Sequence, residues 1–163
     1  MIKKLGQTAM AVVAAGSMAL GAHGAAAAGG QMSFKATLSG TAMFTSQTTV
    51  SFSGSGSATR MGQVTNDGII VITGSDNSCS GGVANTNTER LTDNDGNTLT
   101  TTSQDVACPT GPGQYQGTGQ WTVTGGTGRF SGASGQGTIS GHFDFGAGKF
   151  TITLAGVLVI PDA

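Results

Sequence analysis

The feature that most constrains the fold is a period-two alternation of apolar and polar residues, interrupted again and again by glycine-rich turns. In Ser33–Ser39, for example, Phe34, Ala36 and Leu38 alternate with polar residues. Successive side chains of a strand point to opposite faces, so this pattern predicts strands with one buried face. No ten-residue segment between positions 29 and 163 shows a capped helical period, and we therefore expect an all-β domain.

Short turns separate the strand candidates, which makes neighbouring strands antiparallel. Asn66–Gly68 and Asp93–Gly96 predict hairpin turns, because Asp-Gly supplies the positive φ angles that a type I′ turn needs. We expect about eight strands, drawn from Ser33–Ser39, Thr48–Ser53, Ser57–Thr65, Ile69–Ile72, Asn85–Thr92, Asn97–Val106, Trp121–Thr124, Gly135–Phe145 and Lys149–Ile160. Such a domain must hide its edges, so an antiparallel β-barrel is predicted, with a two-sheet β-sandwich as the alternative.

Two strand candidates are apolar on both faces. Ile69–Ile72 has no polar member, and Lys149–Ile160 carries apolar residues on one whole face and on part of the other. Strands of this kind are covered on both sides. We expect a loop or a partner outside the first, and the second suggests a homo-oligomer.

Residues 1–28 have the organisation of a secretory signal peptide. Lys3 and Lys4 precede an apolar run over Leu5–Leu20, and small residues follow up to Ala28. The alternative, a transmembrane anchor, needs about 20 uninterrupted apolar residues, and polar residues break this run. We expect a secreted or periplasmic protein, with residues 29–163 forming one domain and no membrane insertion after cleavage.

The composition excludes several partner classes. Without Lys3 and Lys4, five basic residues stand against eight acidic ones, and no basic stripe is present. Nucleic-acid binding therefore lacks its electrostatic footprint, and no amphipathic segment marks a membrane surface. The 29 glycines could indicate disorder, but the apolar residues fall at strand spacing, which favours an ordered, glycine-rich domain.

Cys79 and Cys108 are the only cysteines. In an exported chain two cysteines usually pair, so we predict a structural disulfide. A redox pair or metal ligands are the alternatives. Neither has support, because no Cys-x-x-Cys motif is present and His142, the one histidine after the leader, is distant in sequence.

Three segments resemble small exported bacterial proteins with an allene oxide cyclase-like or dirigent-like barrel. Thr124–Gly135 is similar to their Thr-Gly-Gly-Thr-Gly-Arg-Phe-x-Gly-Ala-x-Gly segment, and Gly56–Thr65 to their Gly-x-Ala-Thr-x-x-Gly-x-x-Thr strand. Leu91–Leu99 resembles their hairpin, with Asp-Gly-Asn in place of Asn-Gly-Asp. The resemblance implies an eight-stranded antiparallel barrel. Plant allene oxide cyclases rearrange a fatty-acid epoxide inside such a barrel, and dirigent proteins steer radical coupling of phenols, but no catalytic set of either matches this chain.

Four residues are candidate ligand contacts: Arg60, Trp121, Arg129 and His142. Arg129 can hold an anionic ligand at the barrel mouth; alternatively it bonds loop carbonyls or a carboxylate while Phe130 plugs the barrel end. A lone Trp on a strand is more often core than a ligand stacker. Arg60 can line the interior or face solvent.

His142 and Asp144 share a strand face with Ser140. Neighbours on one face lie about 7 Å apart at the backbone, which opposes an aligned hydrolase triad. We therefore assign no catalytic residue. If this face points inward, these side chains become polar groups of a ligand cavity.

Asp93, Asp95 and Asn97 resemble the start of a calcium loop. The EF-hand pattern requires Gly at its sixth position and Glu at its twelfth, where this chain has Thr98 and Gln104. A hairpin turn explains the same residues, so no metal or other cofactor is expected.

Three functions remain open from the sequence. The first is non-catalytic binding of a small apolar ligand, which predicts a barrel cavity of a few hundred Å³. The second is a structural or interaction protein with a filled barrel that acts through its loops. The third is a cyclase or isomerase for a lipid-like or phenolic substrate, which predicts a cavity with at least two convergent polar groups.

Overall fold

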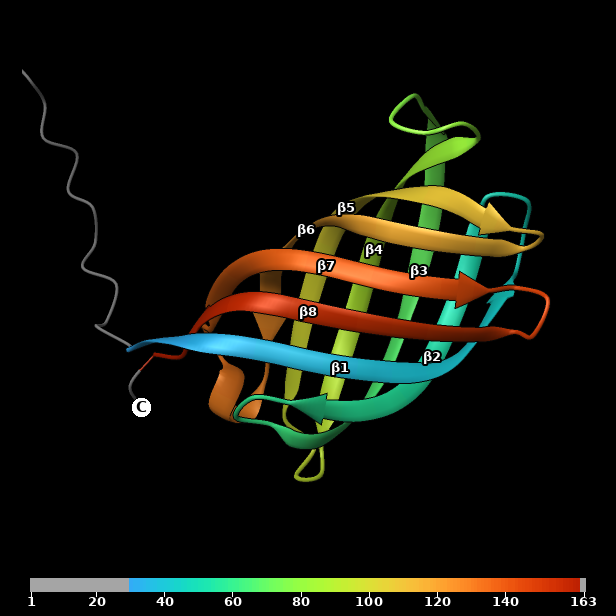
Figure 1. Cartoon of the computed structure of the whole chain (residues 1–163). Helices are drawn as coiled ribbons and strands as arrows, with labels where there is room; N and C mark the ends of the chain where they lie inside the picture. Colours follow the sequence, from blue (N-terminus) through green and yellow to red (C-terminus); the bar gives the residue numbers. More distant parts are fainter. Residues whose placement is uncertain (1–29, 162–163) are drawn as a thin grey trace, which may run out of the picture.

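Eight antiparallel strands close into a barrel (Figure 1), not the two-sheet sandwich. The structure is a computed structural model and describes residues 30–161. The elements in chain order are β1 (Gln31–Phe44), β2 (Thr49–Ala58), β3 (Gly62–Asp76), β4 (Gly82–Asp93), β5 (Thr98–Gly111), β6 (Gln114–Gly126), the 3₁₀ turn η1 (Gly128–Phe130), β7 (Ser134–Asp144) and β8 (Lys149–Val159).

Each strand pairs with its sequence neighbours, and β8 returns to pair with β1 in a register that includes Lys35 opposite Ala155. The β2–β3 and β4–β5 turns, η1 and both described termini lie at one end of the barrel, which we call the closed end (Figure 1). The other four connections lie at the opposite end, which we call the open end. Because every strand has two partners, the barrel has no free edge.

The predicted alternation is confirmed along most strands. On β8, Phe150, Ile152, Leu154 and Leu158 are all buried inside the barrel. At the closed end Trp121 and Phe130 are almost completely buried as well and, with the aliphatic side chains around them, fill that half of the interior. Small barrels are usually filled in this way.

One turn predicted from sequence is wrong. Asn66–Gly68 lies in the middle of β3, and the real β2–β3 turn is at residues 59–61, where Arg60 has a φ of 67°. The reason is a packing requirement rather than a turn requirement. A Cβ on Gly68 would collide with the Phe52 ring, so the glycine is needed for close approach across β2 and β3.

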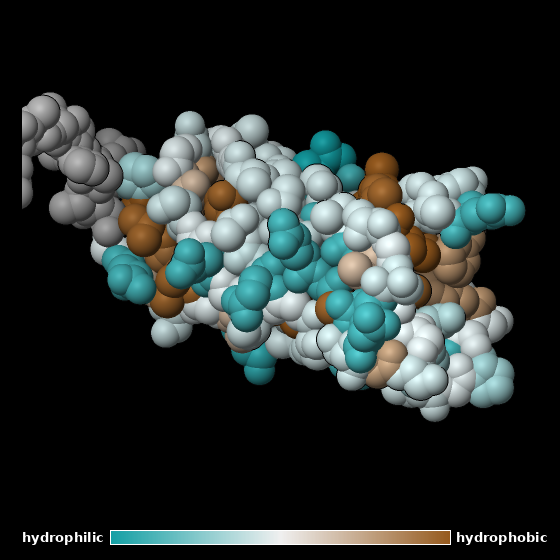
Figure 2. Space-filling model, turned by 90° about the horizontal axis from the view of Figure 1, so that it is seen from above, coloured by the Kyte–Doolittle hydropathy of each residue, from teal (hydrophilic) through white to brown (hydrophobic). Residues whose placement is uncertain are grey.

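The expected cover over the apolar segment of β3 is absent from the described chain. Ile70 points inward and is buried, whereas Ile69 and Val71 are 49% and 41% exposed on the outer wall. Met43 on β1 is exposed on the same wall. The space-filling view from above shows a largely polar surface, with apolar residues gathered mainly toward the two ends of the barrel (Figure 2).

Cys79 and Cys108 form a disulfide, as predicted, with their Cα atoms 6.0 Å apart. The bond ties the β3–β4 connection to β5 at the open end. Such a bond is compatible with an extracellular or periplasmic protein.

The predicted signal peptide, residues 1–28, lies outside the described residues. Within residues 30–161 the structure contains no helix long and apolar enough to cross a membrane.

Candidate functional site

A cavity of about 100 Å³ occupies the open half of the barrel. Its lining is predominantly apolar, with aliphatic side chains from five strands: Val50, Ile70, Ile72, Val83, Ile139 and Ile152. Gly117 and Gly141 also line it on β6 and β7, and the missing side chain of Gly117 leaves space unfilled, because a Cβ there has no neighbour closer than 3.9 Å. The barrel is therefore filled at one end and hollow at the other.

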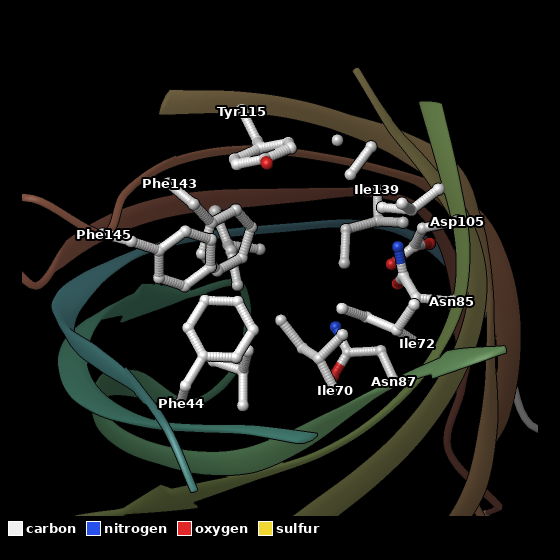
Figure 3. A pocket seen from close by; sticks show the side chains of 16 residues that line it. Phe44, Ile70, Ile72, Asn85, Asn87, Asp105, Tyr115, Ile139, Phe143 and Phe145 are labelled. Atoms are coloured by element: carbon white, nitrogen blue, oxygen red, sulfur yellow. The ribbon is translucent and has the colours of Figure 1, made fainter. Parts of the chain in front are cut away.

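One wall of the cavity is aromatic. Phe44, Tyr115, Phe143 and Phe145 converge there from β1, β6, β7 and the β7–β8 turn (Figure 3). The Phe145 ring lies at the centre of the group, with centroids 4.7 Å from Phe44 and 5.9 Å from both Tyr115 and Phe143. Phe44 is 49% exposed, so it lies at the rim. These contacts are within the usual range for aromatic pairs and hold the wall in place.

The opposite wall carries the polar groups. Asn85 and Asn87 on β4 and Asp105 on β5 lie across the cavity from the aromatic rings (Figure 3). Asn85 and Asp105 are direct partners in the β4–β5 register. The Ser103 hydroxyl lies 3.0 Å from Asp105 Oδ2 and donates a hydrogen bond to it. Gly119, the β6 partner of Asp105, gives this carboxylate its space, because a Cβ there would collide with Asp105 Oδ1.

A second carboxyl lies deeper on the same side of the barrel. Glu89 is 2% exposed and accepts a 2.8 Å hydrogen bond from Asn66 Nδ2. Its other oxygen has no partner, and the same holds for Asn66 Oδ1, Asn87 Oδ1 and Asp105 Oδ1. Buried acceptors without a donor are rare in folded proteins and often mark a place for a ligand, ion or water.

Both interior carboxyls hold their protons more strongly than usual. Burial raises the pKa of Glu89 to about 7, while the hydrogen bond from Asn66 opposes the shift. Burial also raises the pKa of Asp105 to about 6, against hydrogen bonding with Ser103 and Asn87. At neutral pH, Asp105 is mostly ionised and Glu89 is close to its midpoint.

No positive side chain balances these acids inside the described barrel. All its basic residues are exposed: Lys35, Arg60, Arg90, Arg129, Lys149 and His142. Arg90 pairs with Asp67 on the outer wall at 3.0 Å. The interior is thus an acceptor-rich site with no resident cation.

Two of the four predicted ligand residues lie on the outside. Arg60 is exposed in the β2–β3 turn at the closed end, far along the barrel from the cavity. His142 is exposed on the outer face of β7 with Ser140. The face of β7 that points inward is the other one, with Ile139, Gly141 and Phe143.

The other two predicted ligand residues lie at the closed end. Trp121 is buried and its Nε1 donates to the carbonyl oxygens of Thr138 and Ala155, at 2.9 and 3.3 Å. Arg129 pairs with the buried Asp93 carboxylate, and Phe130 beside it is fully buried. The structure thus shows the arrangement in which Phe130 plugs the end and Arg129 bonds a carboxylate. None of the four predicted residues lines the cavity.

The Asp93 carboxylate is saturated by its own surroundings. It accepts hydrogen bonds from the backbone N–H groups of Asp95 and Asn97, from the Asn97 side chain and from Arg129. Burial raises the pKa of Asp93, but these hydrogen bonds outweigh it and the net pKa is lowered. The segment forms the β4–β5 turn, with Gly96 at a φ of 80°. Within residues 30–161 no three His, Cys, Asp or Glu side chains gather as a metal site.

The residues that build the polar wall were not identified from sequence. Asn85, Asn87 and Glu89 alternate with Thr86 and Thr88, so both faces of β4 are polar. A closed barrel must turn one of these polar faces inward, so a strand that is polar on both faces was the available signal. That signal could be interpreted only once the barrel was known to be closed.

Comparison with protein-family models, with curated proteins and with solved structures finds no match to this chain.

Proposed function

We propose that this chain is a non-catalytic binding protein whose barrel accepts a small, largely apolar molecule at the open end. The observation that carries the proposal is the cavity of about 100 Å³, with an aromatic wall facing Asn85, Asn87 and Asp105. Apolar linings with a few placed polar groups are typical of small-molecule sites.

The size of the cavity limits the ligand. At about 100 Å³ it is smaller than the few hundred Å³ expected from the sequence for a barrel that binds a small apolar ligand. Engineered apolar cavities of about 150 Å³ bind benzene. The cavity here is smaller than that, so we expect at most a single ring, or the end of a chain that continues past the rim at Phe44.

The disulfide supports export as the setting of this function, because such bonds persist in oxidising compartments. The resemblance of the Thr124–Gly135 segment to allene oxide cyclase-like and dirigent-like barrels is part of the proposal, and the closed eight-stranded barrel is consistent with it.

The test is an NMR titration with toluene and benzyl alcohol, with binding expected to shift the amide signals of β4 to β7 around the cavity. Gly117→Leu is the blocking variant: Gly117 lines the cavity and a Cβ there has its nearest neighbour 3.9 Å away, so we expect the new side chain to occupy the cavity. Gly74→Leu is the control, since Gly74 is exposed and has no neighbour within 4 Å. Binding lost in Gly117→Leu alone supports the site. If neither probe binds the wild type, the filled-barrel function acting through the loops replaces this proposal.

A second candidate function, an isomerase, is favoured by one observation. Asp105 lies in a largely apolar cavity with its pKa raised to about 6, which suits a group that gives and takes protons near neutral pH. A single-ring ketone such as phenylacetone, incubated in D₂O, tests this. Faster deuterium uptake at the carbon beside the carbonyl with wild type than with Asp105→Asn indicates catalysis. Equal rates would leave ligand binding as the only proposed function.

A further inference from the structure

The interior of the barrel is electrostatically one-sided. Asp105 and Glu89 are carboxyls that point into it from neighbouring strands, and every basic side chain in the described chain is on the outer surface. Burying a charge without a partner is costly unless something compensates it. The described protein supplies Ser103, Asn66 and Asn87 as neutral partners and no cation.

The hydrogen-bonding groups on this side of the barrel also indicate a ligand that donates hydrogen bonds. Asn87 lines the cavity and is 4% exposed, yet its Oδ1 has no donor. One oxygen of Asp105 is likewise without a donor. The polar wall therefore has acceptors in excess, and the group that complements it is a donor rather than another acceptor.

The aromatic wall adds a second preference. The rings of Tyr115, Phe143 and Phe145 face the polar wall across a cavity of about 100 Å³. Aromatic rings pack against the apolar body of a ligand. An anionic head group would meet the Asp105 carboxylate, with no basic side chain in the lining to balance it.

We propose that the cavity binds a protonated amine whose apolar body is about the size of one ring, with the ammonium group directed toward Asp105 on the polar wall. The inference rests on the proposed binding function and narrows its ligand class. It assigns Asp105 as the residue that determines specificity, supported by Asn85 and Asn87. It also excludes carboxylate ligands such as fatty acids from this site.

Four probes with one skeleton test the ligand class: benzylamine, benzyl alcohol, toluene and benzoate, titrated by NMR in phosphate buffer. At about pH 8 benzylamine is largely protonated and Asp105 is ionised. We expect benzylammonium to bind at least about tenfold more tightly than toluene, and benzoate to bind weakest. Toluene binding as tightly as benzylammonium overturns the inference and leaves the proposed function intact. If benzyl alcohol binds as tightly as benzylammonium, the positive charge is not recognised and that part of the inference is overturned. Binding by none of the four removes the proposed function as well.

Asp105→Asn removes the charge while keeping the size of the side chain. We expect it to weaken benzylammonium binding about tenfold and to change toluene binding less than about twofold. Asp95→Asn, which removes an exposed carboxylate in the β4–β5 turn, is the control and should change neither. Unchanged benzylammonium affinity in Asp105→Asn overturns the assignment.

The pH dependence of binding is a further test, because a purely structural role of Asp105 would not make ligand affinity depend on its protonation. The titratable groups around Asp105 are Glu89 on β4 and Tyr115 on β6, while its direct β6 partner is Gly119. Protonation of Asp105 below about pH 6 removes the partner charge, so benzylammonium should bind the wild type more weakly at pH 5 than at pH 8. The Asp105→Asn protein should lose most of this pH dependence, and the Asp105→Asn, Glu89→Gln double variant should lose the remainder, because Glu89 also titrates in this range. Undiminished pH dependence in Asp105→Asn would contradict the proposal.

Discussion

At the scale of single residues, the barrel tolerates buried acids that weaken it. Glu89 is 2% exposed and has only one hydrogen-bond partner, Asn66. Its pKa rises from 4.5 to about 7, a difference that corresponds to about 3 kcal/mol between the two protonation states. A residue retained at such a cost in stability is more informative about function than one that packs well.

Glu89→Gln should change how stability depends on pH. Because the pKa of Glu89 is raised in the fold, its stabilising contribution is complete below about pH 4.5 and is lost as pH rises through about 7. Glutamine cannot ionise, so the variant should gain stability relative to wild type between pH 5 and pH 8, by up to about 3 kcal/mol. Urea unfolding at both pH values measures this.

The control for this experiment is Asp95→Asn, whose carboxylate is exposed in a turn. Its stability difference from wild type should stay nearly constant between the two pH values. Parallel pH profiles for Glu89→Gln and wild type would mean that Glu89 does not hold its proton in the folded state.

At the scale of the strand, glycine acts by making room rather than by turning the chain. Asn66–Gly68 predicts a hairpin from its local chemistry, yet β3 runs straight through it because Phe52 lies over Gly68. Tertiary packing outweighs the local turn preference at this position. The sequence pattern does not show that packing contact. The alternation on β1 and β8 was readable because it depends only on which face is buried.

Gly68→Ala should destabilise the barrel by about 1–3 kcal/mol, because the new methyl group would collide with the Phe52 ring and the Thr88 carbonyl. Gly74→Ala is the matched control on the same strand. Gly74 has no neighbour within 4 Å, so its substitution should stay within about 0.5 kcal/mol of wild type. Equal effects of the two substitutions in denaturant titrations would contradict this account of Gly68.

The polar wall shows the same limit of sequence reasoning. Asn85, Asn87 and Glu89 could be predicted to lie on one face of a strand, but not to face the interior. That assignment depends on the registers that β4 makes with β3 and β5. Arg60 and His142 were plausible from chemistry alone, but Arg60 lies in the exposed β2–β3 turn and the β6–β7 register places His142 on the outer face.

The disulfide is an element-scale clamp on the open end. It joins positions 29 residues apart, and in the chain-entropy relation closing such a loop stabilises the fold by about 3.5 kcal/mol. Replacing Cys79 and Cys108 by serine should lower the free energy of unfolding by about 2–4 kcal/mol. The free energies of unfolding measured in guanidinium for this variant and for the reduced wild type should agree. A variant as stable as the oxidised protein would show that the clamp is dispensable.

At the scale of the whole molecule, closure makes the barrel one cooperative unit. β1 pairs with both β2 and β8, so no strand can leave without breaking two ladders. We predict that Trp121 fluorescence, which reports the closed end, and far-UV circular dichroism, which reports all strands, follow the same urea transition. Midpoints that differ beyond error would mean that the filled and hollow halves unfold separately.

The homo-oligomer stays a prediction. The outer wall of β1 and β3 carries Met43, Ile69 and Val71 exposed to solvent, and these side chains offer apolar area to a second molecule. Light scattering at micromolar concentration separates a monomer from an oligomer, and a monomer would refute the prediction.

The closing pair of strands has an engineering consequence. Gln31 lies opposite Val159 at the closed end, so the start of β1 and the end of β8 are neighbours there. A short linker between β8 and β1, with a new opening at the β5–β6 turn around Gly113, would give a circular permutant whose termini flank the cavity. Two fluorescent reporters fused at those termini would then lie beside the open end of the barrel, where a change in their signal would report the ligand binding proposed above.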